Sequence, residues 1–131
     1  MKALLTMTAV IEMGAGLGLL AVPSFVREAL VGSLPGTAAE LTVFRLVGVA
    51  LMAMALACWF LRHEGRGRAG TRVVIIMLLY NFGAVGALLY AGLGLKSSGV
   101  AFWPGLLLHA AMGVWCLVAL LRKPARVSAG E

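Results

Sequence analysis

Arginine is concentrated at one internal stretch of the sequence, Arg62-His63-Glu64-Gly65-Arg66-Gly67-Arg68-Ala69-Gly70-Thr71-Arg72. Four arginines and one glutamate lie here between two long apolar segments. As helices exposed to water, these segments would be unfavourable. Short connections rich in Lys and Arg resist translocation across a membrane. The stretch therefore predicts a loop on the cytoplasmic side, and the topology of the chain follows from it in both directions.

The composition of the 131-residue chain lies outside the soluble globular class. Hydrophobic residues make up 62% of it, charged residues only 12%, and the mean hydropathy is +1.01, whereas charged residues make up about a quarter of ordinary soluble domains. The net charge is +6, but the basic residues sit at the ends of apolar runs. We interpret the positions of these basic residues as a signal of membrane topology, and we expect them to contact anionic lipid. We therefore predict an integral membrane protein in the lipid bilayer and no nucleic-acid partner.

Four apolar segments are long enough to cross a membrane, since a helix of about 20 apolar residues spans the hydrocarbon core. They cover approximately residues 3–22, 39–61, 73–95 and 101–121. We expect one membrane domain over residues 1–131, an all-α integral membrane four-helix bundle. A signal peptide is the competing interpretation of the first segment, but Glu12 lies inside it and no small-residue cleavage site follows.

The connection between the first two spans, residues 23–40, is predicted to hold a short helix in the membrane interface. Pro23 is suited to the first turn of a helix, which would place apolar residues on one side and Arg27 and Glu28 on the other. A turn follows at Gly32 and Pro35-Gly36. Next come Thr37 and Glu40, spaced as a capping box, which predicts the start of the second span.

The basic residues favour one orientation. On the predicted cytoplasmic side lie Lys2, Arg62, Arg66, Arg68, Arg72, Arg122, Lys123 and Arg126. Only Arg27 and Lys96 fall on the other side, and Arg45 falls within the second span. Because an excess of Lys and Arg marks the cytoplasmic side, we expect both termini to be cytoplasmic.

Each predicted span carries a polar residue at membrane depth: Glu12, Arg45, Asn81 (beside Tyr80) and His109. A charge within the hydrocarbon costs about 2.5–3.5 kcal/mol on insertion scales, so such groups tend to face the bundle interior. From the helix rise, Glu12, Arg45 and His109 lie roughly 8–15 Å below the outer ends of their helices. We expect these three to share a layer, and the five residues together to form a polar core or ligand-binding site.

The roles within this set stay open. Glu12 and Arg45 form either an interhelical ion pair that fixes packing or a site at which Glu12 takes up and releases a proton. For His109, a hydrogen-bonded interface histidine is favoured over a ligand or proton-relay role. Asn81 is interpreted as a polar contact between helices.

Small residues predict where the helices approach one another, because close backbone packing drives helix association in lipid. Gly14 and Gly18 form a G-x-x-x-G in the first span. Similar ridges in the third and fourth spans consist of Gly83, Ala87 and Ala91, and of Gly105 and Gly113.

No catalytic or metal site is expected, because the sequence lacks C-x-x-C, H-E-x-x-H and G-x-S-x-G motifs. A haem held by His63 and His109 fails on geometry, since one lies at the inner surface and the other in the outer half. Cys58 and Cys116 lie at similar depth in their spans and are interpreted as small buried hydrophobes.

The order of these parts resembles the DoxX-like small bacterial membrane proteins. The residues concerned are the segment Pro23-Ser24-Phe25-Val26-Arg27-Glu28-Ala29-Leu30, the opening Arg45-Leu46-Val47-Gly48 of the second span, the basic loop and the closing helical hairpin. The resemblance implies a four-helix bundle in a bacterial inner membrane. Some members of that family are associated with quinone-linked respiratory complexes, so a quinone is the one cofactor that the resemblance suggests.

A more distant resemblance is to the small multidrug resistance transporters, which also have four helices and a membrane-embedded glutamate in the first, here in Ala9-Val10-Ile11-Glu12. The chain departs from them in its longer first loop, its basic central loop and Arg45, whose charge would compete with a cationic substrate.

The sequence is therefore compatible with three functions. The leading one is a non-catalytic accessory or small-ligand-binding bundle. The alternatives are a proton-coupled transporter that uses Glu12 and a quinone-linked redox subunit. A homodimer or a partner membrane subunit is compatible with all three.

Overall fold

The computed structural model describes residues 1–32, 36–64 and 67–122, and all regular structure in these ranges is helical. The elements are α1 (Lys2–Ala21), α2 (Pro23–Val31), α3 (Ala38–Leu61), α4 (Arg68–Leu89), a π-helical turn η1 (Tyr90–Gly94) and α5 (Phe102–Leu121). Four of the helices, with α4 and η1 counted as one, are long and apolar enough to cross a membrane. The predicted all-α class is confirmed, and the four long apolar helices are compatible with a multi-pass membrane protein.

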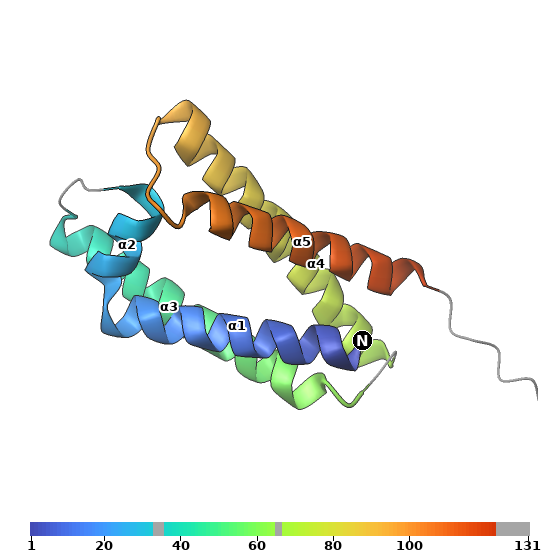
Figure 1. The fold of residues 1–131 in the computed structure, drawn as a ribbon. Helices are drawn as coiled ribbons and strands as arrows, with labels where there is room; N and C mark the ends of the chain where they lie inside the picture. Colours follow the sequence, from blue (N-terminus) through green and yellow to red (C-terminus); the bar gives the residue numbers. More distant parts are fainter. Residues whose placement is uncertain (33–35, 65–66, 123–131) are drawn as a thin grey trace, which may run out of the picture.

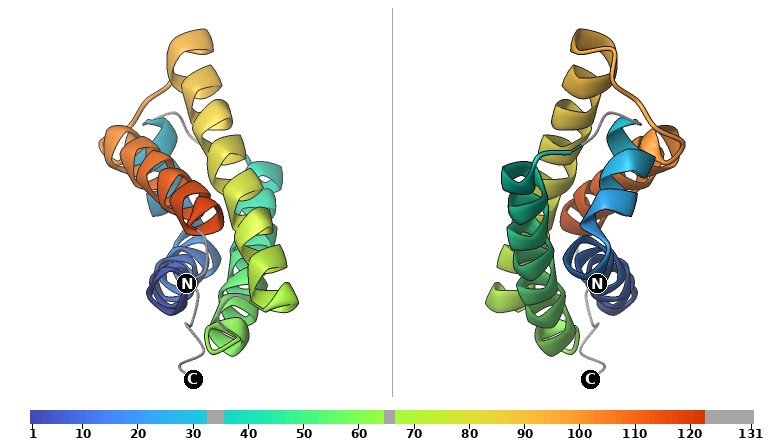
Figure 2. Two further views of the ribbon diagram at one scale, coloured as in Figure 1. Left: turned by 90° about the vertical axis from the view of Figure 1, so that its right-hand side faces the viewer. Right: turned by 90° about the vertical axis from the view of Figure 1, so that its left-hand side faces the viewer.

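The long helices form two antiparallel pairs, α1 with α3 and α4 with α5. Figure 1 shows the two pairs close together at the end that carries the N-terminus and well apart at the end that carries α2. The side views in Figure 2 show α2 at this wide end, next to the start of α5. The arrangement is a V whose narrow end holds the N-terminus.

The narrow end of the V contains the hydrophobic core. Its buried residues come from all four long helices: Leu4, Leu5, Ala9, Cys58, Val74, Met77, Met112, Cys116 and Ala119. The thiol of Cys58 lies 3.3 Å from the sulfur of Met77, which joins α3 to α4. Lipid solvates apolar side chains as well as protein does, so this contact is stabilised by close packing rather than by exclusion of water.

The α1–α3 pair is held at a glycine crossing. A Cβ added to Gly16 would lie 2.7 Å from the carbonyl oxygen of Gly48, and one added to Gly48 would lie 2.7 Å from the carbonyl oxygen of Gly16. Only residues without a Cβ allow this approach. The predicted G-x-x-x-G of Gly14 and Gly18 is not this contact, because a Cβ on Gly14 would meet nothing within 4 Å.

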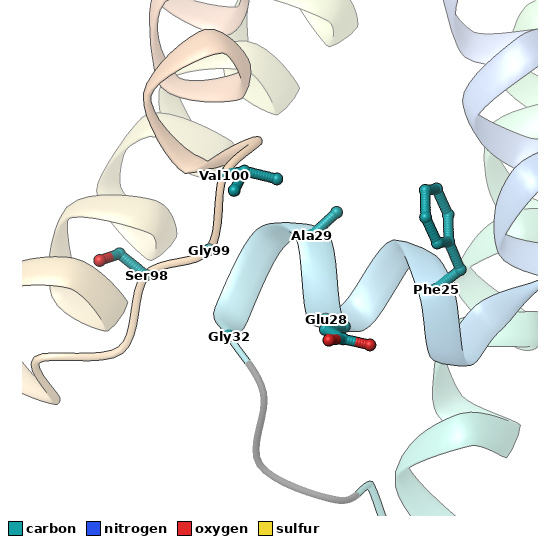
Figure 3. A pocket seen from close by; sticks show the side chains of 7 residues that line it. All are labelled: Phe25, Glu28, Ala29, Gly32, Ser98, Gly99 and Val100. Atoms are coloured by element: carbon teal, nitrogen blue, oxygen red, sulfur yellow. The ribbon is translucent and has the colours of Figure 1, made fainter.

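The short helix α2 is fastened to the segment that precedes α5. The backbone N–H groups of Gly99 and Ala101 donate to the carbonyl oxygens of Leu30 and Ala29, and the Ser97 hydroxyl donates to that of Val31. These bonds satisfy carbonyls that the end of a helix leaves without partners. Figure 3 shows Gly99 beside the last turn of α2, where a Cβ would collide with the carbonyl oxygens of Ala29 and Glu28.

The start of α3 has the predicted capping box. The Glu40 N–H donates to the Thr37 hydroxyl at 3.2 Å, and the Thr37 N–H donates to the Glu40 carboxylate at 2.6 Å. The predicted turn before it is described in part. Gly32 ends α2 at φ +102°, a conformation open to glycine, while Pro35 lies outside the described residues.

One side chain of α2 departs from the prediction. Arg27, expected on the polar side, is 8% exposed, whereas Glu28 beside it is exposed. The reason is that the stem of Arg27 packs beside Gly36 and its guanidinium lies 4.0 Å from the Glu40 carboxylate. The long side chain of Arg27 thus packs against residues that lie just before α3 and at its start.

The third long helix begins earlier than predicted. The sequence placed its start at Val73, but α4 begins at Arg68 and includes three further residues of the basic stretch before Arg72. Arginine and alanine are good helix formers, and an arginine at the end of a membrane helix can extend its charge toward water. The end of the basic stretch therefore forms the first turn of α4. Arg66 within it lies outside the described residues, as do Lys123 and Arg126.

Candidate functional site

A cavity of about 580 Å³ lies between the arms of the V. All five α-helices contribute to its wall, which is apolar apart from a few side chains. Its residues near the wide end include Phe25 and Leu30 of α2 and Gly105 of α5. Cavities of this size and character are typical of binding sites for small molecules.

Three polar side chains face this cavity, Glu12 from α1, Tyr80 from α4 and His109 from α5. The Tyr80 hydroxyl donates to Glu12 Oε2 at 3.2 Å, and the Tyr80 and His109 rings meet edge to face with centroids 5.4 Å apart. Glu12 is only 4% exposed, although a carboxylate is costly to bury. The cavity thus has one polar region, which bridges the two arms of the V.

Asn81 lies behind His109 and supports it. The side chain is 1% exposed, its Nδ2 donates to the Met77 carbonyl oxygen at 2.8 Å, and its Oδ1 lies 3.0 Å from His109 Nδ1. Asn81 therefore orients the imidazole and does not itself line the cavity. The predicted role of Asn81, a polar contact between helices, matches this geometry, because the bond joins α4 to α5.

Arg45 does not join the other predicted site residues. Its side chain is exposed on α3 and does not line the cavity, and no ion pair with Glu12 forms among the described residues. Glu12 lies four residues from Gly16 and Arg45 three residues from Gly48, in opposite directions from the glycine crossing. The two therefore lie about 10 Å apart along the helix axes, so the expected shared layer holds Glu12 and His109 without Arg45.

Sequence reasoning missed part of the cavity wall. The sequence predicts a helix contact at Gly14 and Gly18, yet both line the cavity. A Cβ on Gly14 would meet nothing within 4 Å, whereas one on Gly18 would lie 3.5 Å from Val26 of α2. The contribution of α2 was missed as well, because the predicted interfacial position turned its apolar residues toward lipid. The polar residues at membrane depth were the one sequence signal for this site.

A second cavity, of about 540 Å³, lies where α2 meets the segment before α5. Figure 3 shows the described residues of its wall, among which Glu28 carries the only charge. Of the other polar groups there, the amide of Gly99 is bonded to the Leu30 carbonyl oxygen, and the Ser98 side chain points away from Glu28 in Figure 3. No set of polar side chains converges on this cavity, so it is the weaker candidate.

The remaining reactive groups offer no second site. Cys58 and Cys116 are both free and fully buried in the core at the narrow end. Across residues 1–32, 36–64 and 67–122, no three His, Cys, Asp or Glu side chains gather closely enough to hold a metal ion.

Comparisons with known protein families, with curated proteins and with solved structures gave no match to this chain.

Proposed function

We propose that this protein is a small membrane protein that binds a small, largely apolar ligand between the arms of its V and has no catalytic activity of its own. The observation that carries the proposal is the cavity, which is lined by five helices and has Glu12, Tyr80 and His109 at one polar region. An apolar wall with a few convergent polar groups is the usual design of a ligand site.

The wider setting is also proposed. The basic residues and the resemblance to the DoxX-like proteins support a bacterial inner membrane with both termini in the cytoplasm. In that orientation the wide end of the V faces the opposite side. In an accessory role, the protein would also bind a second copy of the chain or a partner membrane subunit.

The cavity can be tested by filling it. Gly14 lines the cavity and has open space where a Cβ would be, so Gly14→Leu should occupy the ligand's volume without disturbing a helix contact. Gly83→Leu is the matched control, because Gly83 also has open space and does not line the cavity.

Native mass spectrometry of the purified protein with 1-dodecanol or decylubiquinone as probe would give the result. We expect wild type and Gly83→Leu to hold one molecule of at least one probe and Gly14→Leu to hold at least tenfold less. A wild-type protein that binds neither probe, or equal binding by Gly14→Leu, would contradict the proposal.

A proton-coupled transporter is the second candidate, and the position of Arg45 favours it. Among the described residues, Glu12 is the only Asp, Glu, Lys or Arg on the cavity wall, and Arg45, whose charge would have competed with a cationic substrate, lies off the wall. In proteoliposomes, tetrabutylammonium should then drive proton release that Glu12→Gln abolishes. Absence of release by the wild type would remove this candidate.

A further inference from the structure

The hydrogen bonds behind the cavity fix which nitrogen of His109 carries its proton. Asn81 Nδ2 donates to the Met77 carbonyl oxygen, and a carbonyl oxygen accepts only, so the Asn81 amide has one orientation. Its Oδ1 then faces His109 Nδ1 at 3.0 Å. Because an amide oxygen also only accepts, Nδ1 must carry the hydrogen. Neutral His109 is therefore left with an acceptor lone pair on Nε2.

His109 Nε2 has no hydrogen-bond partner within the described part of the chain, and the residue lines the cavity. A ligand is the group that would complete the bonding of this nitrogen. Once a ligand covers this nitrogen, an acceptor left unpaired is unfavourable, which favours a ligand with a donor.

Glu12 and Tyr80 present acceptors as well. The Tyr80 hydroxyl uses its single hydrogen to donate to Glu12 Oε2, which leaves the lone pairs of its oxygen. Glu12 in its ionised form accepts at both oxygens, and its Oε1 has no protein partner among the described residues. With Glu12 ionised and His109 neutral, the polar region therefore offers a ligand two carboxylate or hydroxyl oxygens and one imidazole nitrogen, and no donor.

We propose that the cavity selects ligands whose polar head is a hydrogen-bond donor, an O–H or N–H group, attached to an apolar body. This inference rests on the proposed ligand-binding function and narrows its ligand class. A hydroquinone, an alcohol or an amine has such a head. An oxidised quinone has only carbonyl acceptors, which would face the lone pairs of Glu12 and His109.

Four probes with the same twelve-carbon chain separate hydrogen bonding from charge. They are 1-dodecanol, dodecyl methyl ether, dodecylamine and dodecyltrimethylammonium. The first pair is neutral and the second pair is cationic, and only one member of each pair has a donor. We expect the donor of each pair to bind wild-type protein about tenfold or more tightly than its partner, because the partner covers the acceptors of the cavity without pairing them.

Comparison of 1-dodecanol with dodecylamine shows whether the cavity prefers a hydroxyl or an ammonium head. Dodecylamine well ahead of 1-dodecanol would assign an ammonium head, and the reverse order would assign a hydroxyl head. Equal binding of dodecylamine and dodecyltrimethylammonium would show that charge alone holds the ligand and would overturn the donor proposal.

The variant Glu12→Gln replaces one hydrogen-bond acceptor of the cavity with a donor. Tyr80 can still donate to the side-chain oxygen of glutamine, whose NH₂ group then supplies a donor to the cavity. The preference for 1-dodecanol over the ether should fall by about fivefold or more. Glu64→Gln is the matched control, because Glu64 is exposed outside the cavity, and it should keep the wild-type preference.

The outcomes distinguish this inference from the function on which it rests. If the ether and the alcohol bind wild type equally and Gly14→Leu excludes both, the cavity binds ligands but does not select donors, and the inference fails alone. If Gly14→Leu excludes none of the probes, the cavity is not the binding site and both proposals fail.

Discussion

At the level of single residues, Thr8 is the clearest weak point of the core. Its side chain is 1% exposed, and its hydroxyl oxygen has no hydrogen-bond partner in the described structure. Replacing a buried unsatisfied hydroxyl with a methyl group of the same shape removes a desolvation penalty. We therefore expect Thr8→Val to raise the free energy of unfolding by about 1 kcal/mol.

Denaturant unfolding in detergent would measure this change. Thr6→Val is the control, because Thr6 lies on the same helix but is only half-buried, and it should leave stability nearly unchanged. A loss of stability in Thr8→Val would show instead that the hydroxyl has a partner.

The site residues show what the sequence can and cannot predict at this scale. Glu12 and His109 were placed at one depth from the helix rise alone, because depth depends only on residue count. Arg45 was placed with them by the same count, yet it points away, since the direction of a side chain depends on which helix packs against which face. The nitrogen of His109 that carries the proton follows from the hydrogen bond with Asn81, and no sequence pattern predicts this bond.

Among the helices, the contact between α1 and α3 gives a sharp prediction. Both Gly14 and Gly16 belong to α1, but only Gly16 lies against Gly48 and Met52 of α3. Gly16→Ala would press a methyl group into a backbone oxygen, and we expect it to lower the free energy of unfolding by about 1–3 kcal/mol.

The matched variant Gly14→Ala has free space for its methyl group. We expect it to be neutral, or to stabilise by up to about 1 kcal/mol through helix propensity. The same unfolding measurement ranks the two variants. The reverse order would mean that the G-x-x-x-G spacing marks the true helix contact and that the α1–α3 crossing is different.

Element boundaries followed from local chemistry more reliably than element contacts did. The Thr37–Glu40 capping box fixed the start of α3 because both partners lie within four residues of each other. The glycine ridges do not identify the helix contacts in the same way. A helix can contain several glycines, and their spacing does not show which one lies against a neighbouring helix. The burial of Arg27 was also missed, since its carboxylate partner Glu40 lies on another helix.

At the level of the whole molecule, the sequence predicted four long helices but not the V that they form. The length and apolar character of each span follow from composition along the chain. The pairing of α1 with α3 and of α4 with α5 depends instead on surfaces that meet across the fold. The cavity exists because the two pairs pack together at the narrow end and diverge toward the wide end, so no single segment of the sequence encodes it.

The proposed orientation of the V can be tested with two cysteine variants. His63 follows α3 at the narrow end and Ser98 precedes α5 at the wide end, and both are exposed. The native Cys58 and Cys116 are 0% exposed, so a membrane-impermeant maleimide should not label the wild type. With the basic residues held in the cytoplasm, Ser98→Cys should react in spheroplasts, whereas His63→Cys should react only after the membrane is opened. Labelling of His63→Cys in intact spheroplasts would invert the proposed topology and turn the wide end of the cavity toward the cytoplasm.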